Sequence, residues 1–514
     1  MDTVEVCKQP MPEATPFDAD PISTASRADI EEQIQIFIRR QDVGKVTQLK
    51  RALNSLVPIA SLPDDLLIEI FALYPYAEDQ SRSKFDPLIP TPYHWLRYTH
   101  VCHHWRHVAL QTPILWTDIV LINQNECIKE MLIRSGQAPV EVSSAPGRLA
   151  PMDMLKICLD ELHRVQSLNI RVSPGVVEEL ADAEYREDGQ LESLSVSLGS
   201  AYPWISDHGL SEALGVFLTG VGSRKLKKLQ VIGIHLFPNL TPAFPLLTSF
   251  SWSTPSPRLA VNDFLYFLQS IPSLQVLKLW DVFRPHRMSA KPTLHTSLPC
   301  LKELHMSNEY LPYEDLLPYL HLTRDASLNL DVHGVDTHSH LMSFLSLLHS
   351  AALSNELLAV ELIRYENSRI EFKGWEGAFS HEIELGRAAP IPKLRLLIEL
   401  ASEFEDSMHV PDQLLEALPV ATVDYLRLRN TLNWHWYSAF AKMRNVTKLY
   451  VAGELWDVPE ALVFSCIPPE SRGLNDPELR LFPRLRYLRL KEPENVQTAP
   501  IFAQKLHGFF VLRL

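Results

Sequence analysis

The sequence is poor in the features that mark several common protein classes. Its 514 residues include only six cysteines, which are scattered and form no CxxC pair. Scattered thiols in a long chain indicate a reduced intracellular protein without a disulfide framework, so we expect a cytoplasmic or nuclear location. No apolar run approaches the length of a membrane span, and the acidic N-terminal segment lacks the apolar core of a signal peptide. A membrane protein is therefore not expected.

Positive charge and glycine are also scarce. Lys and Arg number 48 against 62 Asp and Glu, a net charge of −14, which argues against a broad nucleic-acid or anionic-membrane surface. The chain has only 18 glycines against 38 prolines, so glycine-rich phosphate-binding loops are not expected. The sequence contains no GxSxG, no HExxH and no kinase signature set. We therefore expect a protein that is not an enzyme and needs no cofactor.

The N-terminal region contains a disorder signal followed by helix signals. Residues 1–25 are rich in Pro, Asp and Thr and predict a disordered segment. Ser26 and Asp29 resemble a capping box, and apolar residues at helical spacing follow over residues 26–57. Pro63 next favours a helix start, with Asp64 and Asp65 in the first turn. One apolar stripe continues this helix to Pro75, which is expected to end it.

A second helix is predicted after the polar loop of residues 78–92. Tyr98, Val101, Cys102, Trp105, Val108 and Ala109 share its apolar face. His100 and His104, and also His103 and His107, have the i, i+4 spacing of metal ligands. The motif supplies no acidic third ligand, so we expect these histidines to form a solvated helix face and predict no metal site.

From residue 165 onward a different pattern recurs. Its frame is apolar-x-x-apolar-x-apolar, with central positions such as Phe250, Leu277 and Leu304, which are 27 residues apart. This is the leucine-rich-repeat pattern, in which each repeat adds one short strand to a parallel sheet. The asparagine expected three residues after each frame is missing, since Glu309 and Thr431 stand there. An irregular solenoid is therefore predicted.

The helical stretches LPDDLLIEIF (62–71) and VCHHWRHVALQTPILW (101–116) closely resemble the F-box, in the F-box-like form common in mushroom-type fungi. The resemblance extends over about residues 46–142. It implies docking on the adaptor subunit of SCF-type cullin–RING ubiquitin ligases, and through it on cullin. A unit this small cannot bury its whole apolar stripe, which agrees with an exposed partner surface. The positions that match the family's adaptor-facing residues, with Trp105 assigned to either core or interface, are Leu62, Pro63, Leu66, Ile70, Val101 and Trp105.

These signals predict an α+β protein with an N-terminal helical F-box module and an irregular leucine-rich-repeat solenoid built on a parallel β-sheet. The resemblance implies a substrate receptor of an SCF ligase, whose solenoid holds an unidentified target protein. One alternative is a repeat scaffold with a degenerate F-box that joins no ligase. A weaker one is a metal-dependent hydrolase built on the HxH of His338 and His340. The predicted division is 1–25 disordered, 26–57 helical, 58–121 F-box-like, 122–164 helical connector and 165–514 solenoid.

The last repeats indicate where the target binds. Residues between the apolar frame positions alternate onto the open face of the sheet. In the last three clear repeats these residues are basic or aromatic, which favours an acidic or phosphorylated segment. The alternative is that the cations pair with nearby acids such as Glu454 and Glu492. The predicted target-binding residues are Tyr425, Arg427, Arg429, Lys448, Tyr450, Tyr487, Arg489 and Lys491.

Overall fold

The chain forms two compact units, which are described separately. One contains residues 1–117 and 130–138, and the other contains residues 118–129 and 139–514. The computed structural model describes residues 26–81, 93–122, 124–181, 189–199, 208–220, 223–236, 244–254, 259–283, 292–309, 311–351, 356–365, 369–377, 391–401, 410–429, 440, 442–452 and 482–491. In these residues no helix is long and apolar enough to cross a membrane.

The first unit is helical. Its elements are α1 (Arg27–Arg39), α2 (Val43–Ser55), η2 (Pro58–Ser61), α3 (Asp64–Ser81), η3 (His94–His100), α4 (His103–Gln111) and η4 (Pro113–Trp116), and α5 (Asn125–Ser135) crosses the boundary between the units. The capping box predicted at the start of α1 is confirmed, because the Ser26 side chain accepts from the Asp29 amide and the Asp29 carboxylate accepts from the Ser26 amide. Ile30, Ile34 and Leu49 form a small core between α1 and α2.

Two local predictions for these helices were wrong. Helix α3 continues through Pro75 to Ser81, although proline was expected to end it. Tyr98 and Val101 do not belong to the helix that carries Trp105. The backbone of Cys102 is extended (φ −154°, ψ 171°), and its Sγ accepts a hydrogen bond from the Trp105 amide at 3.5 Å. Cys102 therefore acts as the N-cap of α4, and the residues before it form the separate 3₁₀ turn η3.

The second unit combines strands with helices. Its strands are β1 (Asp118–Leu121), β2 (Val140–Ser144), β3 (Val165–Val172), β4 (Ser193–Leu198), β5 (Lys228–Ile232), β6 (Ser249–Ser253), β7 (Val276–Trp280), β8 (Thr296–Leu298), β9 (Glu303–Glu309), β10 (Leu320–Leu322), β11 (Ser327–Val335), β12 (Ala359–Tyr365), β13 (Arg369–Trp375), β14 (Leu394–Leu400), β15 (Tyr425–Arg429), β16 (Lys448–Ala452) and β17 (Tyr487–Lys491). Its further helical elements are α6 (Met152–Leu159), α7 (Pro174–Ala181), α8 (His208–Gly220), η5 (Ser223–Lys225), α9 (Val261–Gln269), α10 (Leu311–Leu316), η7 (Leu317–Tyr319), α11 (His338–Ala351) and α12 (Val410–Ala417).

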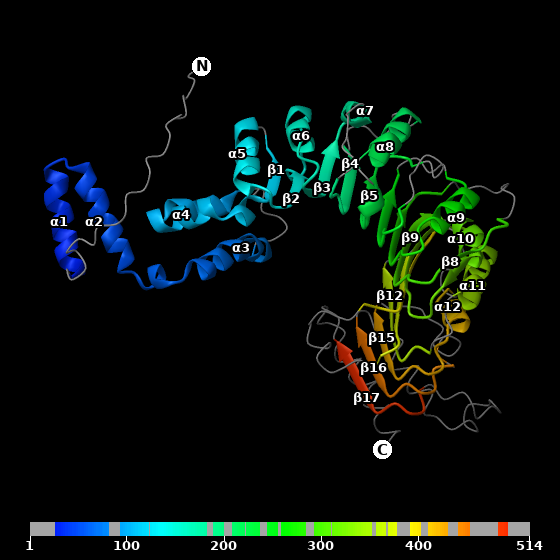
Figure 1. The fold of residues 1–514 in the computed structure, drawn as a ribbon. Helices are drawn as coiled ribbons and strands as arrows, with labels where there is room; N and C mark the ends of the chain where they lie inside the picture. Colours follow the sequence, from blue (N-terminus) through cyan, green and yellow to red (C-terminus); the bar gives the residue numbers. More distant parts are fainter. Residues whose placement is uncertain are drawn as a thin grey trace, which may run out of the picture. The chain divides into compact units, whose positions relative to one another are not determined.

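Fifteen of the described strands form one sheet, and its order follows the chain from β1 to β7 and then β9 and β11. All of these neighbours are parallel. Helices α6–α12 lie along one face of the sheet, and no described helix covers the other face, which we call the open face (Figure 1). A helical region followed by this parallel-strand sheet is consistent with a leucine-rich-repeat-like solenoid.

The order of the sheet changes after β11. The next strands in the sheet are β14, β13 and β12, in reverse chain order, and then β15 to β17. Strand β13 is antiparallel to both neighbours, whereas β12 is parallel to β15. The predicted sheet was parallel, and β13 departs from that prediction. The hairpin of β12 and β13 places residues of β12, β13 and β14 side by side. No repeat period in the sequence predicts this hairpin.

The apolar frame identified most strands of the sheet. The sequence predicts ten frames between Val165 and Leu490. In the first nine of them, up to Val451, all three apolar positions are buried. The sheet begins earlier than residue 165, because β1 and β2 already pair in parallel with buried Ile119 and Val142 facing the helices. A complete frame, Trp116/Ile119/Leu121, accompanies β1, whereas Gln137 stands at the first frame position before β2. The segment 122–164 contains β2 as well as helices.

Buried side chains outside the expected asparagine positions donate hydrogen bonds to backbone carbonyls. Trp252 Nε1 donates to the Ile234 carbonyl at 3.0 Å, and Thr296 Oγ1 donates to the Leu265 carbonyl at 3.0 Å. The Tyr313 hydroxyl lies 2.9 Å from the Met306 carbonyl and 2.7 Å from that of Asp331. These residues occur at irregular positions, which agrees with the irregular repeat spacing.

Candidate functional site

The helices α3 and α4 share a core that is centred on aromatic rings. Phe71 stacks on Tyr98 with ring centroids 5.0 Å apart and lies 5.2 Å from Trp105. Leu67, Val108 and Ala109 complete the buried cluster. Trp105 is only 8% exposed, so the structure places it in the core rather than on the surface.

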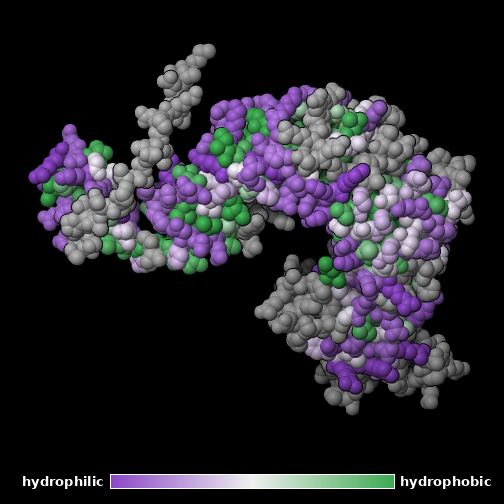
Figure 2. Space-filling view, viewed as in Figure 1, coloured by the Kyte–Doolittle hydropathy of each residue, from purple (hydrophilic) through white to green (hydrophobic). Residues whose placement is uncertain are grey.

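Other apolar residues of α3, and Val101 before α4, face outward. Leu66 and Val101 are 45% and 55% exposed, and Ile70 and Leu73 are exposed as well. Leu66, Ile70 and Leu73 follow i, i+4, i+7 spacing and therefore lie on one face of α3. Figure 2 shows hydrophobic surface over α3 and α4. This exposed apolar row lies beside a core that is packed without it. Such a row is typical of a protein-docking surface.

The two remaining adaptor-facing candidates lie at the start of α3. Pro63 is exposed and stands directly before the helix, where its carbonyl accepts from the Leu66 and Leu67 amides. Leu62 is half-buried and packs against the core around Phe71. Substituting Leu62 would therefore change packing and surface together, whereas Leu66 and Ile70 are surface residues.

The histidines of α4 lie on its outer side, apart from the aromatic core. His103 and His107 are exposed and stack with centroids 6.4 Å apart. His104 Nε2 lies 3.3 Å from a carboxylate oxygen of Asp64. Partial burial, with the positive charge of Arg51, lowers the pKa of His103. Among the described residues no group of three or more His, Cys, Asp or Glu side chains could hold a metal ion.

The HxH pair lies at the start of α11. His338 Nδ1 lies 2.8 Å from Gln413 Nε2, and His340 Nδ1 contacts the Asp336 carboxylate. Residues two apart on a helix do not share a face. The two imidazoles therefore contact different partners instead of converging on one point.

The open face of the sheet carries a continuous row of side chains. The strand registers align one residue of each strand from β3 to β17, and we call this series the middle row. It runs through Asn169, Ser195, Gln230, Ser251, Lys278, His305, Asn329, Arg395, Lys373, Glu361, Arg427, Tyr450 and Arg489. Three residues predicted to bind the target, Arg427, Tyr450 and Arg489, are thus direct neighbours.

The structure brings the basic and aromatic candidates together around one ring. The guanidinium carbons of Arg427 and Arg489 lie 4.8 and 5.7 Å from the centre of the Tyr450 ring. Lys448 and Tyr487 are exposed beside this group. Tyr425, which was expected on the surface, is buried in a cluster with Ala359 and Trp375. The side chain of Lys491 lies outside the described residues.

Acidic residues that the sequence analysis did not single out face these cations. Glu361 Oε1 lies 3.3 Å from Arg427 Nε and 3.0 Å from an Arg429 nitrogen. Glu361 Oε2 lies 3.6 Å from Lys373 Nζ, which also contacts Glu371 at 3.0 Å. The alternative acids, Glu454 and Glu492, lie outside the described residues.

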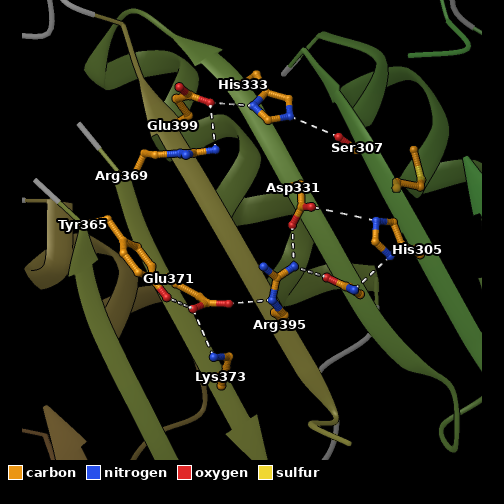
Figure 3. Close-up of polar contacts among 12 residues, drawn as sticks. His305, Ser307, Asp331, His333, Tyr365, Arg369, Glu371, Lys373, Arg395 and Glu399 are labelled. Atoms are coloured by element: carbon orange, nitrogen blue, oxygen red, sulfur yellow. Dashed lines mark hydrogen bonds and ion pairs between the residues drawn. The ribbon is translucent and has the colours of Figure 1, made fainter. Parts of the chain in front are cut away.

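The ion pairs continue into a wider polar network (Figure 3). Arg395 donates to Glu371 and to Asp331, each at 2.6 Å, and Tyr365 donates to Glu371 at 2.7 Å. Burial alone would raise the pKa of Glu371, but the hydrogen bonds from Tyr365, Lys373 and Arg395 outweigh it and lower the pKa. Burial lowers the pKa of His305, which lies 3.8 Å from Asp331.

A second polar group in Figure 3 resembles a hydrolytic triad in its order of side chains. Ser307 Oγ lies 3.1 Å from His333 Nε2, and His333 Nδ1 lies 2.9 Å from Glu399 Oε2. Arg369 contacts the same carboxylate oxygen at 3.6 Å. Ser307 lies within β9, whose backbone is paired with β7 and β11 on both sides. Such a strand offers no free amides for an oxyanion, so we interpret these side chains as polar packing.

Comparison with known proteins identifies the helical segment. Residues 59–122 match the F-box-like family. No curated protein matches the chain. A solved structure, the TLR13–ssRNA13 complex, is 15% identical, with 72% of this chain covered and a TM-score of 0.29. The chain spans 53% of the length of that protein. At this TM-score the likeness supports no inference about fold or ligand.

Proposed function

We propose that this chain is a substrate receptor of an SCF-type cullin–RING ubiquitin ligase, as in fungal F-box proteins. The observation that carries the proposal is the F-box-like segment, in which Leu66, Ile70 and Val101 remain exposed at the adaptor-facing positions. F-box domains generally bind the adaptor subunit, which in turn binds cullin. The open face of the sheet then holds the target protein, with no role for nucleic acid or a membrane.

In this proposal the chain itself performs no bond chemistry and carries no cofactor. It raises the rate of ubiquitin transfer by holding the target near a charged enzyme in the assembled ligase. The chain acts in the cytoplasm, the nucleus or both. A scaffold that has lost adaptor binding is the alternative, and adaptor capture distinguishes the two.

The test is co-purification of the adaptor with the full chain and with the double variant Leu66→Ala/Ile70→Ala. Because apolar anchors cost about 2 kcal/mol or more when truncated, the variant should bind the adaptor at least about thirtyfold more weakly. Its thermal stability should stay close to that of the wild type, since both side chains are exposed. Ile36→Ala/Ile38→Ala is the matched control, because these exposed residues of α1 lie outside the family match. A wild-type chain that does not capture the adaptor would support the scaffold alternative.

A further inference from the structure

The ion pairs near the C-terminal end of the sheet are arranged in layers. The side chains of Glu361 and Glu371 are 9% and 4% exposed. Their cationic partners are more exposed, at 23% for Lys373, 26% for Arg427 and 39% for Arg429. The carboxylates therefore lie beneath the cations, and a partner that approaches the open face meets ammonium and guanidinium groups first.

This connected network carries a small excess of positive charge. Its carboxylates are Asp331, Glu361 and Glu371, and its cations are Lys373, Arg395, Arg427 and Arg429. Among the described residues, four cations against three carboxylates leave one unit of positive charge. Burial keeps His305 neutral by lowering its pKa, and burial with Glu371 nearby keeps Tyr365 neutral by raising its pKa to about 12. The whole chain carries −14, so the charge of this network is opposite in sign to the net charge of the molecule.

The cations of this face are also held in place before any partner binds. Glu361 contacts both Arg427 and Arg429, and the Tyr450 ring packs against Arg427 and Arg489. Free arginine side chains lose rotational freedom when they bind, which weakens binding. Because these guanidinium groups are already ordered, that cost is reduced.

We propose that the face of β12, β13, β15, β16 and β17 docks an acidic peptide segment of the target, which it recognises through aspartate and glutamate side chains. This inference rests on the proposed receptor function and names its target chemistry. A carboxylate carries one negative charge, which matches the excess on the network. A phosphate carries about 1.5 to 2 negative charges at pH 7 and meets Glu361 and Glu371 directly beneath the cations, so the match is poorer.

The test measures binding of labelled peptides to the full-length protein by fluorescence anisotropy. The probes are a glycine-spaced hexaglutamate peptide, the same peptide with two glutamates replaced by phosphoserine, and the corresponding lysine peptide. The glutamate peptide should bind best and the lysine peptide should not bind. The variant Arg427→Glu/Arg489→Glu should bind the glutamate peptide at least about tenfold more weakly than the wild type does. Arg224→Glu/Lys228→Glu makes the same change in net charge at exposed residues of η5 and β5, and it should bind like the wild type.

A second variant tests the role of the buried carboxylate. Glu361→Gln raises the network's excess from one to two positive charges, so the affinity ratio of phosphoserine to glutamate peptide should rise at least about threefold. A wild-type preference for the phosphoserine peptide would overturn the carboxylate assignment. An equal loss in the control variant would overturn the site itself. Adaptor capture, measured on the same proteins, reports the ligase proposal separately, since none of these substitutions lies in residues 59–122.

Discussion

The middle row changes its chemistry between two regions of the same sheet. From β3 to β6 it consists of the uncharged residues Asn169, Ser195, Gln230 and Ser251, whereas from β14 to β15 it consists of Arg395, Lys373, Glu361 and Arg427. Both regions bury the same apolar positions toward the helices. The buried apolar positions therefore determine the backbone of the sheet, while the residues on the open face differ in chemistry from region to region.

The two regions satisfy their polar groups in different ways. In the uncharged region the serines of β4 make single, long contacts, from Ser195 Oγ to Gln230 at 3.3 Å and from Ser197 Oγ to the Ile170 carbonyl at 3.4 Å. In the charged region Glu361 meets three cations and Glu371 meets two. A half-buried charge needs such partners, because a charge removed from water without them is costly. The charged region should therefore be far more sensitive to substitution.

The largest effect is expected for Glu371→Ala. This change removes a buried carboxylate and leaves Lys373 and Arg395 without it, so we expect a loss of about 3 kcal/mol in the free energy of unfolding. Denaturant titration of the full chain measures the loss. Glu309→Ala, which removes an exposed carboxylate on β9, is the control and should cost within about 0.5 kcal/mol. If both variants lost the same free energy of unfolding, the buried carboxylate would stabilise the fold no more than the exposed one does.

An acid titration tests whether the charge of the Glu371 carboxylate stabilises the fold. The folded-state pKa of Glu371 is lowered, so its ionised form stabilises the fold above the unfolded-state pKa. That contribution is lost as the pH falls through the lowered folded-state value. The stability difference between wild type and Glu371→Gln should therefore shrink as the pH falls from 7 into this acid range. A difference that stays constant with pH would show that the charge of Glu371 does not stabilise the fold.

The sequence predicted the frame but not the network on it, for a physical reason. A buried apolar position repeats with the backbone, so Phe250, Leu277 and Leu304 are visible as a local pattern. Glu361, Lys373 and Glu371 lie within the hairpin of β12 and β13. They meet Arg395 and Arg427 only because this hairpin is inserted between β14 and β15. Local periodicity carries no information about that order.

In the helical unit, too, the local sequence pattern predicted some features and not others. Its apolar spacing and the F-box resemblance identified Leu66, Ile70 and Val101, which are exposed. They did not decide whether Trp105 was core or surface, because that depends on how its ring packs with Phe71 and Tyr98. Pro75 was expected to end α3, and the helix continues through it.

The smallest effect is expected in the uncharged region, for the double variant Ser195→Ala/Ser251→Ala. Ser195 makes one long hydrogen bond to Gln230, and both hydroxyls lie half-buried on the open face, where water reaches them. Exposed or half-exposed positions of this kind change the free energy of unfolding by within about 0.5 kcal/mol. The double variant should therefore unfold at nearly the same denaturant concentration as the wild type, and it should bind the glutamate peptide unchanged. A loss comparable to that of Glu371→Ala would show that the hydroxyls stabilise the sheet as strongly as the ion pairs do, and the contrast between the two regions would then be one of chemistry alone.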